Sequence, residues 1–345
     1  MRSSGVSESE TARRPEGTRL PSWAVTRTEI RAFQPTDAET AGRLLAARHA
    51  AHRRVEPSLS ARFEDPAVAM AEVEAALAAG ATGAVAVAGG EVTGYLLGQT
   101  KDNPVWGPNA WVEAAGQAVT EAEVVRDLYA VAAPFWVDAG KDAHYALVPA
   151  HDAALVDAWF RLGFGQQQVH GIREVPDQPF ADVPGVVVRL AERRDIPVLG
   201  ELDLALPRHQ ALAPTYSAGE TPTLEEAVQS WEDTFDEEGW HYVVAEHDGR
   251  VVGAGVGCAL EESSTHLGIT RPDHAGFLGF AAVLPEARGL GAGRALGEAV
   301  LAWTAAAGFT SAVTDWRATN LLSSRTWPKL GYRPSFLRLH RRIGY

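Results

Sequence analysis

Cysteine is nearly absent from the sequence, since Cys258 is the one cysteine among 345 residues. A single thiol excludes an internal disulfide and a cysteine-rich metal site, and it favours a reducing compartment. Cys258 follows the segment Val-Gly-Ala-Gly-Val-Gly, which is typical of a buried strand. We therefore expect a structural thiol rather than a nucleophile, in a cytoplasmic protein that needs no metal.

Long apolar runs and an excess of positive charge are also missing. No apolar stretch approaches the ~20 residues that span a membrane, and the formal net charge is -13. Nucleic acids and anionic membranes attract concentrated positive charge, so the sequence predicts neither as a partner. A negative balance instead suits a small molecule that carries an amine.

The N-terminal segment differs in composition from the remainder of the chain. It is rich in Ser, Arg, Glu, Pro and Gly, and it contains no apolar run of the kind that a signal peptide needs. Such a composition cannot bury enough apolar surface to offset the entropy of ordering. We therefore expect a disordered tail at residues 1–27.

What is present is an internal repeat. Residues 83–98 and 242–257 each consist of an apolar strand, a turn centred on glycine and a second strand, which is typical of a β-hairpin. Upstream of each hairpin, a short strand precedes the expected start of a helix. Thr36 to Glu39 fits a capping box there in the first half, and Asp195 is the expected cap in the second.

The similarity continues downstream of the hairpins. Each half ends with a helical segment that carries a Trp four residues before the Gly of Leu-Gly-aromatic, and these glycines, Gly163 and Gly331, are 168 residues apart. The hairpin valines Val92 and Val251 are 159 residues apart, and Asp37 and Asp195 at the two expected helix starts are 158 apart. Three landmarks in one order at nearly one offset indicate a duplicated domain.

The pattern of elements predicts an α/β fold made of two tandem domains. Helices alternate with strands in each copy, which favours a mixed central sheet flanked by helices on both faces. The predicted boundaries are a first domain at residues 28–175, a linker rich in Pro and Asp at 176–184, and a second domain at 185–345.

A glycine-rich bend occupies "VLPEARGLGAGRALGEAVLAW", residues 283–303. It follows a buried strand, "GFLGFAAV", and after Gly291 the apolar residues recur at helical spacing as far as an expected C-cap at Gly308. The first N–H groups of a helix lack intrahelical partners, the helix dipole adds positive potential, and glycine allows close approach. The bend therefore predicts a phosphate cradle, and the alternative is a tight turn that binds nothing.

Two common nucleotide motifs do not fit this bend. A Walker loop needs Gly-Lys-Ser/Thr where Gly293 and Arg294 precede an alanine, and a dinucleotide fingerprint needs a glycine in place of Arg294. The bend does contain Arg-x-x-Gly-x-Gly from Arg288 to Gly293, preceded by Val-x-Pro. This pattern resembles the acetyl-coenzyme A signature of the GNAT superfamily of N-acetyltransferases.

The resemblance covers residues 185–342 and, more loosely, residues 28–175. It implies two GNAT-like domains with splayed sheets, and an N-acetyltransferase that moves an acetyl group from acetyl-CoA to a primary amine of a small molecule by direct attack in a ternary complex. For Asn320 the alternative is an N-cap of the last long helix. The residues implied to bind the coenzyme are Ala282, Val283, Leu284, Arg288, Gly289, Leu290, Gly291, Ala292, Gly293, Arg294, Asn320, Ser323 and Trp327.

Acetyl transfer needs a neutral amine, an aligned donor, and stabilisation of the oxyanion and the leaving thiolate. Many members of the superfamily place a proton-donating Tyr where this chain has Trp327 and, in the first half, Trp159. Indole cannot serve as that acid. Asp315 and His274 are candidate bases, and His209 is a candidate substrate contact. For each of these three the alternative is a structural or surface role.

The first copy lacks the glycine bend. The corresponding residues 115–136 include Glu121, Glu123 and Asp127, which place negative charge where a diphosphate needs positive charge. We expect this copy to have lost coenzyme binding and to shape the acceptor site as a packing partner. Trp106 and Trp111 are expected to fill the interface between the copies or to form a lid.

Other functions remain compatible with these residues. One alternative is a non-catalytic acyl-CoA-binding or sensor protein, which the missing Tyr favours. Another is an acetyltransferase like mycothiol synthase, which has a degenerate first copy and an active second one. Two fused copies would mimic the common dimer of the superfamily, so we expect a monomer or a homodimer.

Overall fold

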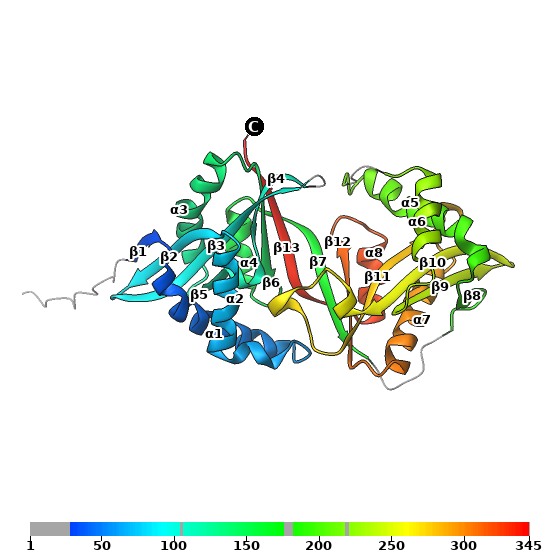
Figure 1. Cartoon of the computed structure of the whole chain (residues 1–345), viewed down its shortest axis with the longest axis horizontal. Coiled ribbons are helices and arrows are strands. Elements are labelled where there is room, and N and C mark those ends of the chain that lie inside the picture. Colours follow the sequence, from blue (N-terminus) through cyan, green and yellow to red (C-terminus); the bar gives the residue numbers. More distant parts are fainter. Residues whose placement is uncertain (1–27, 104–105, 176–181, 218–220, 345) are drawn as a thin grey trace, which may run out of the picture.

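The computed structural model describes residues 28–103, 106–175, 182–217 and 221–344. The predicted tail and most of the predicted linker lie outside these residues, so both stay predictions. Figure 1 shows two lobes side by side, with the first half of the chain on the left and the second half on the right.

In the first half, helices alternate with strands and the order follows the predicted one. The strands are β1 (Glu29–Ala32), β2 (Thr82–Ala88), β3 (Glu91–Asn103), β4 (Gly107–Val112), β5 (Gln117–Val119), β6 (Ala143–Pro149) and β7 (Gly165–Glu174). The helices are α1 (Ala38–Val55), α2 (Pro66–Ala78), α3 (Val124–Asp138) and α4 (Ala153–Arg161).

The second half repeats this order. Its strands are β8 (Val187–Leu190), β9 (Trp240–His247), β10 (Arg250–Ala259), β11 (Ala275–Val283), β12 (Ser311–Arg317) and β13 (Arg333–Arg342). Its helices are α5 (Ile196–Ala211), α6 (Leu224–Thr234), α7 (Ala292–Ala306) and α8 (Ser323–Thr326). Among the described residues, no helix is both long and apolar enough to cross a membrane.

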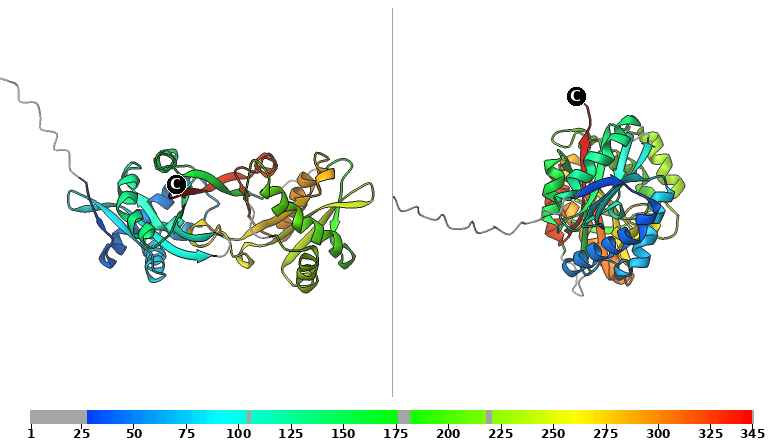
Figure 2. Two further views of the ribbon diagram at one scale, coloured as in Figure 1. Left: turned by 90° about the horizontal axis from the view of Figure 1, so that it is seen from above. Right: turned by 90° about the vertical axis from the view of Figure 1, so that its left-hand side faces the viewer.

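The two halves share one continuous sheet. Its strand order is β1-β2-β3-β4-β6-β13-β7-β12-β11-β10-β9-β8, and β5 pairs with β3 beside this path. Each half therefore contributes its last strand to the sheet of the other: β13 pairs with β6, and β7 pairs with β12. In Figures 1 and 2, β13 (red) and β7 (green) run through the centre of the molecule.

The exchanged strands are paired along most of their length. β7 is antiparallel to β12 over all seven residues of β12, from Ser311 opposite Glu174 to Arg317 opposite Gln168. β13 is antiparallel both to β6 and to β7. The backbone groups at the centre of the sheet are thus satisfied only when both halves are present.

Helices cover both faces of the sheet, as the sequence predicts. Side chains of α3, α4 and α7 share one core with alternate strand residues, including Val243 and Ala245 of β9. The intervening Val244 faces a separate core under α5 on the opposite side of the sheet. This alternation is the period of two expected for a strand that is buried on both faces.

The predicted hairpins are confirmed as β2 with β3 and β9 with β10. Their turns contain Gly90 and Gly249, both with positive φ, a conformation that glycine adopts without strain. Cys258 lies in β10 and is fully buried, which agrees with the expected structural thiol.

Asp195 is the N-cap residue of α5, as predicted, but the capping box of the first half joins Gln34 and Asp37, two residues before the predicted Thr36 to Glu39. α1 and α5 begin one residue after Asp37 and Asp195, whose side chains make no cap hydrogen bond. Each carboxylate instead binds an arginine of the preceding strand at 2.7 Å, Arg31 in the first half and Arg189 in the second. The arginine holds the pKa of each carboxyl below its usual range. The same carboxylates also accept a backbone N–H, from Gln34 in the first half and from Glu192 in the second, both at 2.8 Å, and these bonds belong to a capping box at the 3₁₀ turn before each helix.

The last helix also differs between the halves. Trp159 lies inside α4, whereas α8 is a short helix that ends just before Trp327. Pro328 follows, lacks an N–H group and crowds the preceding turn, so the chain continues only as a 3₁₀ turn to Leu330. The expectation of a last long helix in the second half is therefore wrong.

Candidate active site

The site begins where two neighbouring strands separate. β11 pairs in parallel with β12 only from Ala275 to Leu278, opposite Ser311 to Thr314. Beyond that point β11 stays with β10 and β12 stays with β7. A bulge at Gly279 marks the divergence, because Phe280 and Leu278 face consecutive residues of β10. The implied splay of the sheet is therefore present, and it leaves backbone groups of β11 without a strand partner on one side.

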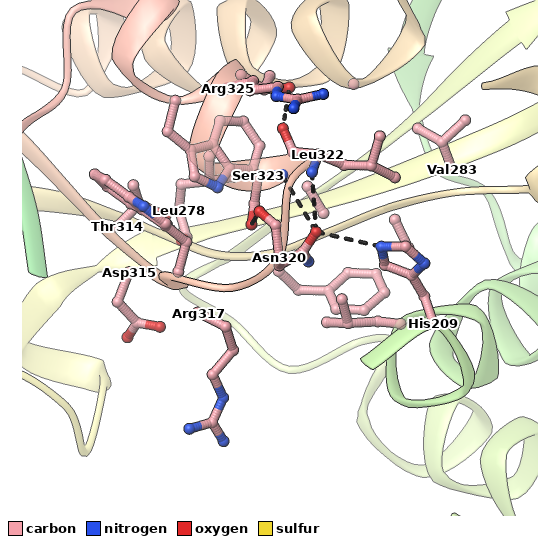
Figure 3. Close-up of a pocket in the computed structure, with 18 of the residues that line it drawn as sticks. His209, Leu278, Val283, Thr314, Asp315, Arg317, Asn320, Leu322, Ser323 and Arg325 are labelled. Atoms are coloured by element: carbon pink, nitrogen blue, oxygen red, sulfur yellow. Dashed lines mark hydrogen bonds between the residues drawn. The ribbon is translucent and has the colours of Figure 1, made fainter. Parts of the chain in front are cut away.

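A cavity of about 870 Å³ occupies this gap. Its walls come from α5, β11, β12, α8, the start of α7 and the exchanged strand β13, all of the second half, and from β7 and Trp106 of the first half. This volume lies within the range of sites for small molecules and cofactors. Figure 3 shows part of its lining, with His209 of α5 facing Asn320 across the space.

One end of the cavity is the glycine bend. α7 starts at Ala292, as predicted, and its N-cap Gly291 has a φ of +89° and provides no side-chain cap. Arg288, Gly289, Gly293 and Arg294 line the cavity beside it. The N–H groups of the first turn therefore have no side-chain acceptor, and two cations flank them. This arrangement fits an anion such as a diphosphate.

Three predicted residues meet in the middle of the cavity. The side-chain Oδ1 of Asn320 lies 3.2 Å from Nε2 of His209 and accepts hydrogen bonds from the N–H groups of Leu322 and Ser323 at 3.1 and 3.5 Å. The hydroxyl of Ser323 donates to the backbone carbonyl of Asn320. Asn320 thus lines the cavity and caps the turn before α8, but it is not the N-cap of a long helix, because the N-cap of the short α8 is Leu322.

Asp315 forms another part of the wall. Its side chain keeps 26% exposure because it faces the cavity, yet protein encloses it on the other sides, and this burial raises the pKa of its carboxyl. Nε2 of His266 lies 3.9 Å from the Asp315 carboxylate. Burial lowers the pKa of His266 to about 3, so this histidine is neutral and the contact is not an ion pair. The ring of His170 packs against His266 at 4.3 Å between centroids.

The predicted site residues divide into two groups. His274, Leu284 and Leu290 do not line the cavity, and His274 is an exposed residue just before β11 with a φ of +46°. The structure brings the others together around one space. These are His209, Ala282, Val283, Arg288, Gly289, Gly291, Ala292, Gly293, Arg294, Asp315, Asn320, Ser323 and Trp327.

Sequence analysis missed Gln168, Arg317 and Arg338 as cavity residues, and it left Trp106 between a filler and a lid. Gln168 and Arg338 reach the cavity because β7 and β13 are exchanged, and no local pattern indicates that exchange. Trp106 directly precedes β4 and lines the cavity. Trp111 does not line the cavity and stacks on Tyr145 of the same half, with 4.5 Å between the ring centres.

The equivalent place in the first half is filled. The side chain of Gln117 donates from Nε2 to the carbonyl of Leu147 at 3.0 Å, and its Oε1 accepts from the indole of Trp159 at 2.9 Å. Leu147 and Trp159 stand 168 residues before Asp315 and Trp327. At the start of α3, Glu123 forms ion pairs with arginines. A glutamine side chain thus takes the space that is open in the second half.

The comparisons with known proteins agree with this geometry. Residues 207–332 match the model of the Acetyltransferase (GNAT) family. A GCN5-related N-acetyltransferase from Sphaerobacter thermophilus is similar in structure, with a TM-score of 0.53, 17% identity, and coverage of 92% of this chain and 97% of that one. The glucosamine N-acetyltransferase region of a fungal multi-domain beta-N-acetylglucosaminidase has a TM-score of 0.50 and 16% identity, over 92% of this chain and 38% of that one.

A tandem GNAT protein from the clavulanic acid biosynthesis pathway also matches, with a TM-score of 0.46 and 17% identity, over 92% of this chain and 99% of that chain. A search of the curated proteins finds no match. The fold and the splayed cavity define an α/β protein built from two tandem GNAT-like halves. Residues 207–332 are thus similar to the acetyltransferases of the GNAT family, and this similarity supports acyl transfer as the class of reaction.

Proposed function

We propose that this protein is an N-acetyltransferase that uses acetyl-CoA and acetylates a primary amine of a small molecule in a ternary complex. The observation that carries the proposal is the gap between β11 and β12, which opens onto the uncapped, glycine-lined start of α7. A long coenzyme with a diphosphate at one end and a chain rich in amides at the other is complementary to such a channel.

Acetyl-CoA supplies an acetyl group activated as a thioester. The N–H groups at the start of α7, with Arg288 and Arg294, bind its diphosphate. The unpaired edge of β11 between Gly279 and Val283 binds the pantetheine amides as a further strand would, and one of its N–H groups stabilises the oxyanion. Asn320 holds the turn that forms the opposite wall.

Asp315 is the base that we assign to the reaction. Its carboxylate faces the cavity, and its raised pKa makes it a better proton acceptor than an exposed aspartate. His266 lies behind it and is neutral, so it restricts the position of the carboxylate without adding charge. His209 contacts the acceptor from α5 on the other side of the cavity.

The absence of tyrosine from the described cavity lining favours a second candidate function. Trp327 occupies the position that the resemblance gives to the acid, and an indole does not protonate a thiolate. A protein that binds acyl-CoA without turning it over would keep the cradle and lack the acid. Release of free thiol in the presence of an amine separates the two functions.

The test combines binding and turnover. Calorimetry with acetyl-CoA is carried out on wild type, on Gly289→Glu and on Gly308→Glu. Both glycines have positive φ, +90° and +83°, and a Cβ added at either position has no neighbouring atom within 4 Å. The two substitutions therefore cause a similar backbone strain and no steric clash of the Cβ. Gly289 lies at the start of α7 and Gly308 at its end. Loss of binding in Gly289→Glu alone, with thiol release by wild type on an amine panel, supports the proposal, and equal binding by all three contradicts it.

A further inference from the structure

The cavity carries more positive charge than the coenzyme end alone accounts for. Among the described lining residues the cations are Arg288, Arg294, Arg317, Arg325, Lys329 and Arg338, and the one carboxylate is Asp315. This excess is local, because the chain as a whole has a net charge of -13. Arg288 and Arg294 flank the glycine bend, whereas Figure 3 shows Arg317 pointing away from α8, the helix that carries Arg325.

Arg317 and Arg338 form a separate cationic pair. They come from β12 and from the exchanged strand β13, and each guanidinium carbon lies 5.0 Å from the ring centre of Trp106. Trp106 belongs to the first half of the chain. The pair therefore exists only because the two halves share one sheet.

The two guanidinium groups have donors to spare. Nε of Arg338 donates to the side chain of Gln167 at 2.8 Å, but its Nη2 is buried and has no partner among the described residues. Nη1 of Arg317 is also buried without a partner in this part of the chain. Neither arginine forms an ion pair within the described part of the chain. Buried donors nearly always have acceptors in proteins, so these unpaired groups mark the place of a missing acceptor.

The charge balance indicates which anion fits. Asp315 faces the same end of the cavity and partly offsets the two arginines, which leaves a surplus of about one positive charge. Burial and the neighbouring Arg317 lower the pKa of Arg338 to about 10, so it stays charged at neutral pH. A carboxylate carries one negative charge, which matches this surplus, and it accepts paired hydrogen bonds from guanidinium groups. The two negative charges of a phosphate dianion are more than the site neutralises.

We propose that Arg317 and Arg338 bind a carboxylate of the acceptor, with Trp106 of the first half packed against them. The acceptor would then be an amine that also carries a carboxylate, as an amino acid does. This inference rests on the proposed function and specifies its substrate class. It also gives the first half a direct role in selecting the acceptor.

The turnover test uses matched pairs of amines. Glycine, β-alanine, 4-aminobutyrate and 5-aminovalerate are each compared with the corresponding amide, and aminoalkyl phosphonates of the same lengths test the dianion. For wild type we expect a carboxylated amine to have a KM about 10- to 100-fold below that of its amide, because charged hydrogen bonds contribute on that scale. Arg317→Gln and Arg338→Gln should abolish this ratio, and Arg338→Lys should restore part of it.

The control is Arg342→Gln on the same strand, since Arg342 pairs with Asp142 at 2.8 Å and does not line the cavity. The ratio should stay at the wild-type value in this variant. A ratio near one in wild type, or one that survives in both glutamine variants, overturns the inference. A preference for the phosphonates overturns the choice of carboxylate.

Binding separates the inference from the proposed function. Calorimetry with the same amines and amides, in the presence of coenzyme A, needs no turnover. If no amine releases thiol but a carboxylated amine binds wild type and not Arg317→Gln, the proposed function fails and the carboxylate site stands. If neutral amines are acetylated and carboxylated ones show no preferential binding, the proposed function stands and the carboxylate site fails.

Discussion

Oδ1 of Asn320 lies 3.2 Å from Nε2 of His209, which stands 111 residues earlier in the chain. This contact connects α5 to the turn before α8 across the cavity, and the same oxygen accepts two backbone N–H groups of that turn. The turn before α8, which forms one wall of the cavity, is thus hydrogen-bonded to α5, the helix on the side where we propose that the acceptor binds.

Asn320→Ala should lower the free energy of unfolding by about 1 kcal/mol, because loss of a side-chain cap leaves its N–H partners unpaired. It should also weaken acetyl-CoA binding, since the turn forms the wall of the channel. Chemical denaturation and calorimetry measure the two effects. Thr319→Ala, at the exposed neighbouring residue, serves as the control. Equal stabilities of the two variants would show that the cap contributes little.

Asp315→Asn should reduce kcat while leaving acetyl-CoA binding intact. An amide cannot accept the proton of the amine, and a positioned base contributes about 10²- to 10⁴-fold to a rate. In wild type, activity should fall as the pH drops through the raised pKa of this carboxyl. Steady-state rates between pH 5 and 9 measure both effects, with exposed Asp273→Asn as the control. If Asp315→Asn keeps the wild-type rate and pH profile, another group is the base.

The same substitution should increase stability at neutral pH. Because burial raises the pKa of Asp315 above its unfolded value of about 3.9, the folded state holds this proton more tightly. Between the two pKa values the folded state binds more protons, so stability falls as the pH rises through that window. Between pH 4 and pH 8, the free energy of unfolding measured by denaturation should fall less in Asp315→Asn than in wild type. A larger loss in the variant would reverse the sign of this argument.

Acetyl-CoA should bind with a stoichiometry of one per chain. The side chain of Gln117 fills the place in the first half that corresponds to the open gap in the second, with hydrogen bonds to Leu147 and Trp159. Gln117→Ala should cost about 1–3 kcal/mol of stability, because it leaves buried polar groups unpaired. Calorimetry gives the stoichiometry and denaturation gives the stability. Two sites per wild-type chain would contradict the assignment of the first half as closed.

The features that the sequence predicts well are those encoded by neighbouring residues. The start of α7 at Ala292 follows from the glycines and the helical spacing after them, and the hairpins follow from alternating strands around Gly90 and Gly249. The acids at the two helix starts, Asp37 and Asp195, are also recognisable from local pattern, but their arginine partners lie on the preceding strands, and the helix-start pattern does not specify them.

The cavity wall contributed by the first half is not predictable from local pattern. The two last strands have similar apolar alternation, and nothing in either strand specifies which sheet edge it joins. The choice depends on contacts that form only in the assembled sheet, such as the ion pairs of Arg333 with Glu56 and Glu174 at 2.6 Å. Arg338 therefore reads as a surface residue in the sequence and lies inside the cavity in the structure.

The strand exchange leads to a last prediction about separated halves. A fragment of residues 185–345 lacks β7, so the edge of β12 from Ser311 to Arg317 loses its antiparallel partner and β13 loses β6. Unpaired edges of this length favour aggregation or association. We expect this fragment alone to be less stable than the whole chain or to self-associate, and we expect coexpression with residues 28–180 to yield a one-to-one complex.

Size-exclusion chromatography with light scattering gives the masses, and thermal unfolding gives the stabilities. The whole chain with a cleavable linker inserted at residue 180 is the control. A monomeric 185–345 fragment with the melting temperature of the intact protein would show that the exchanged strands are dispensable, because β13 would then have paired with β12 in the place of β7.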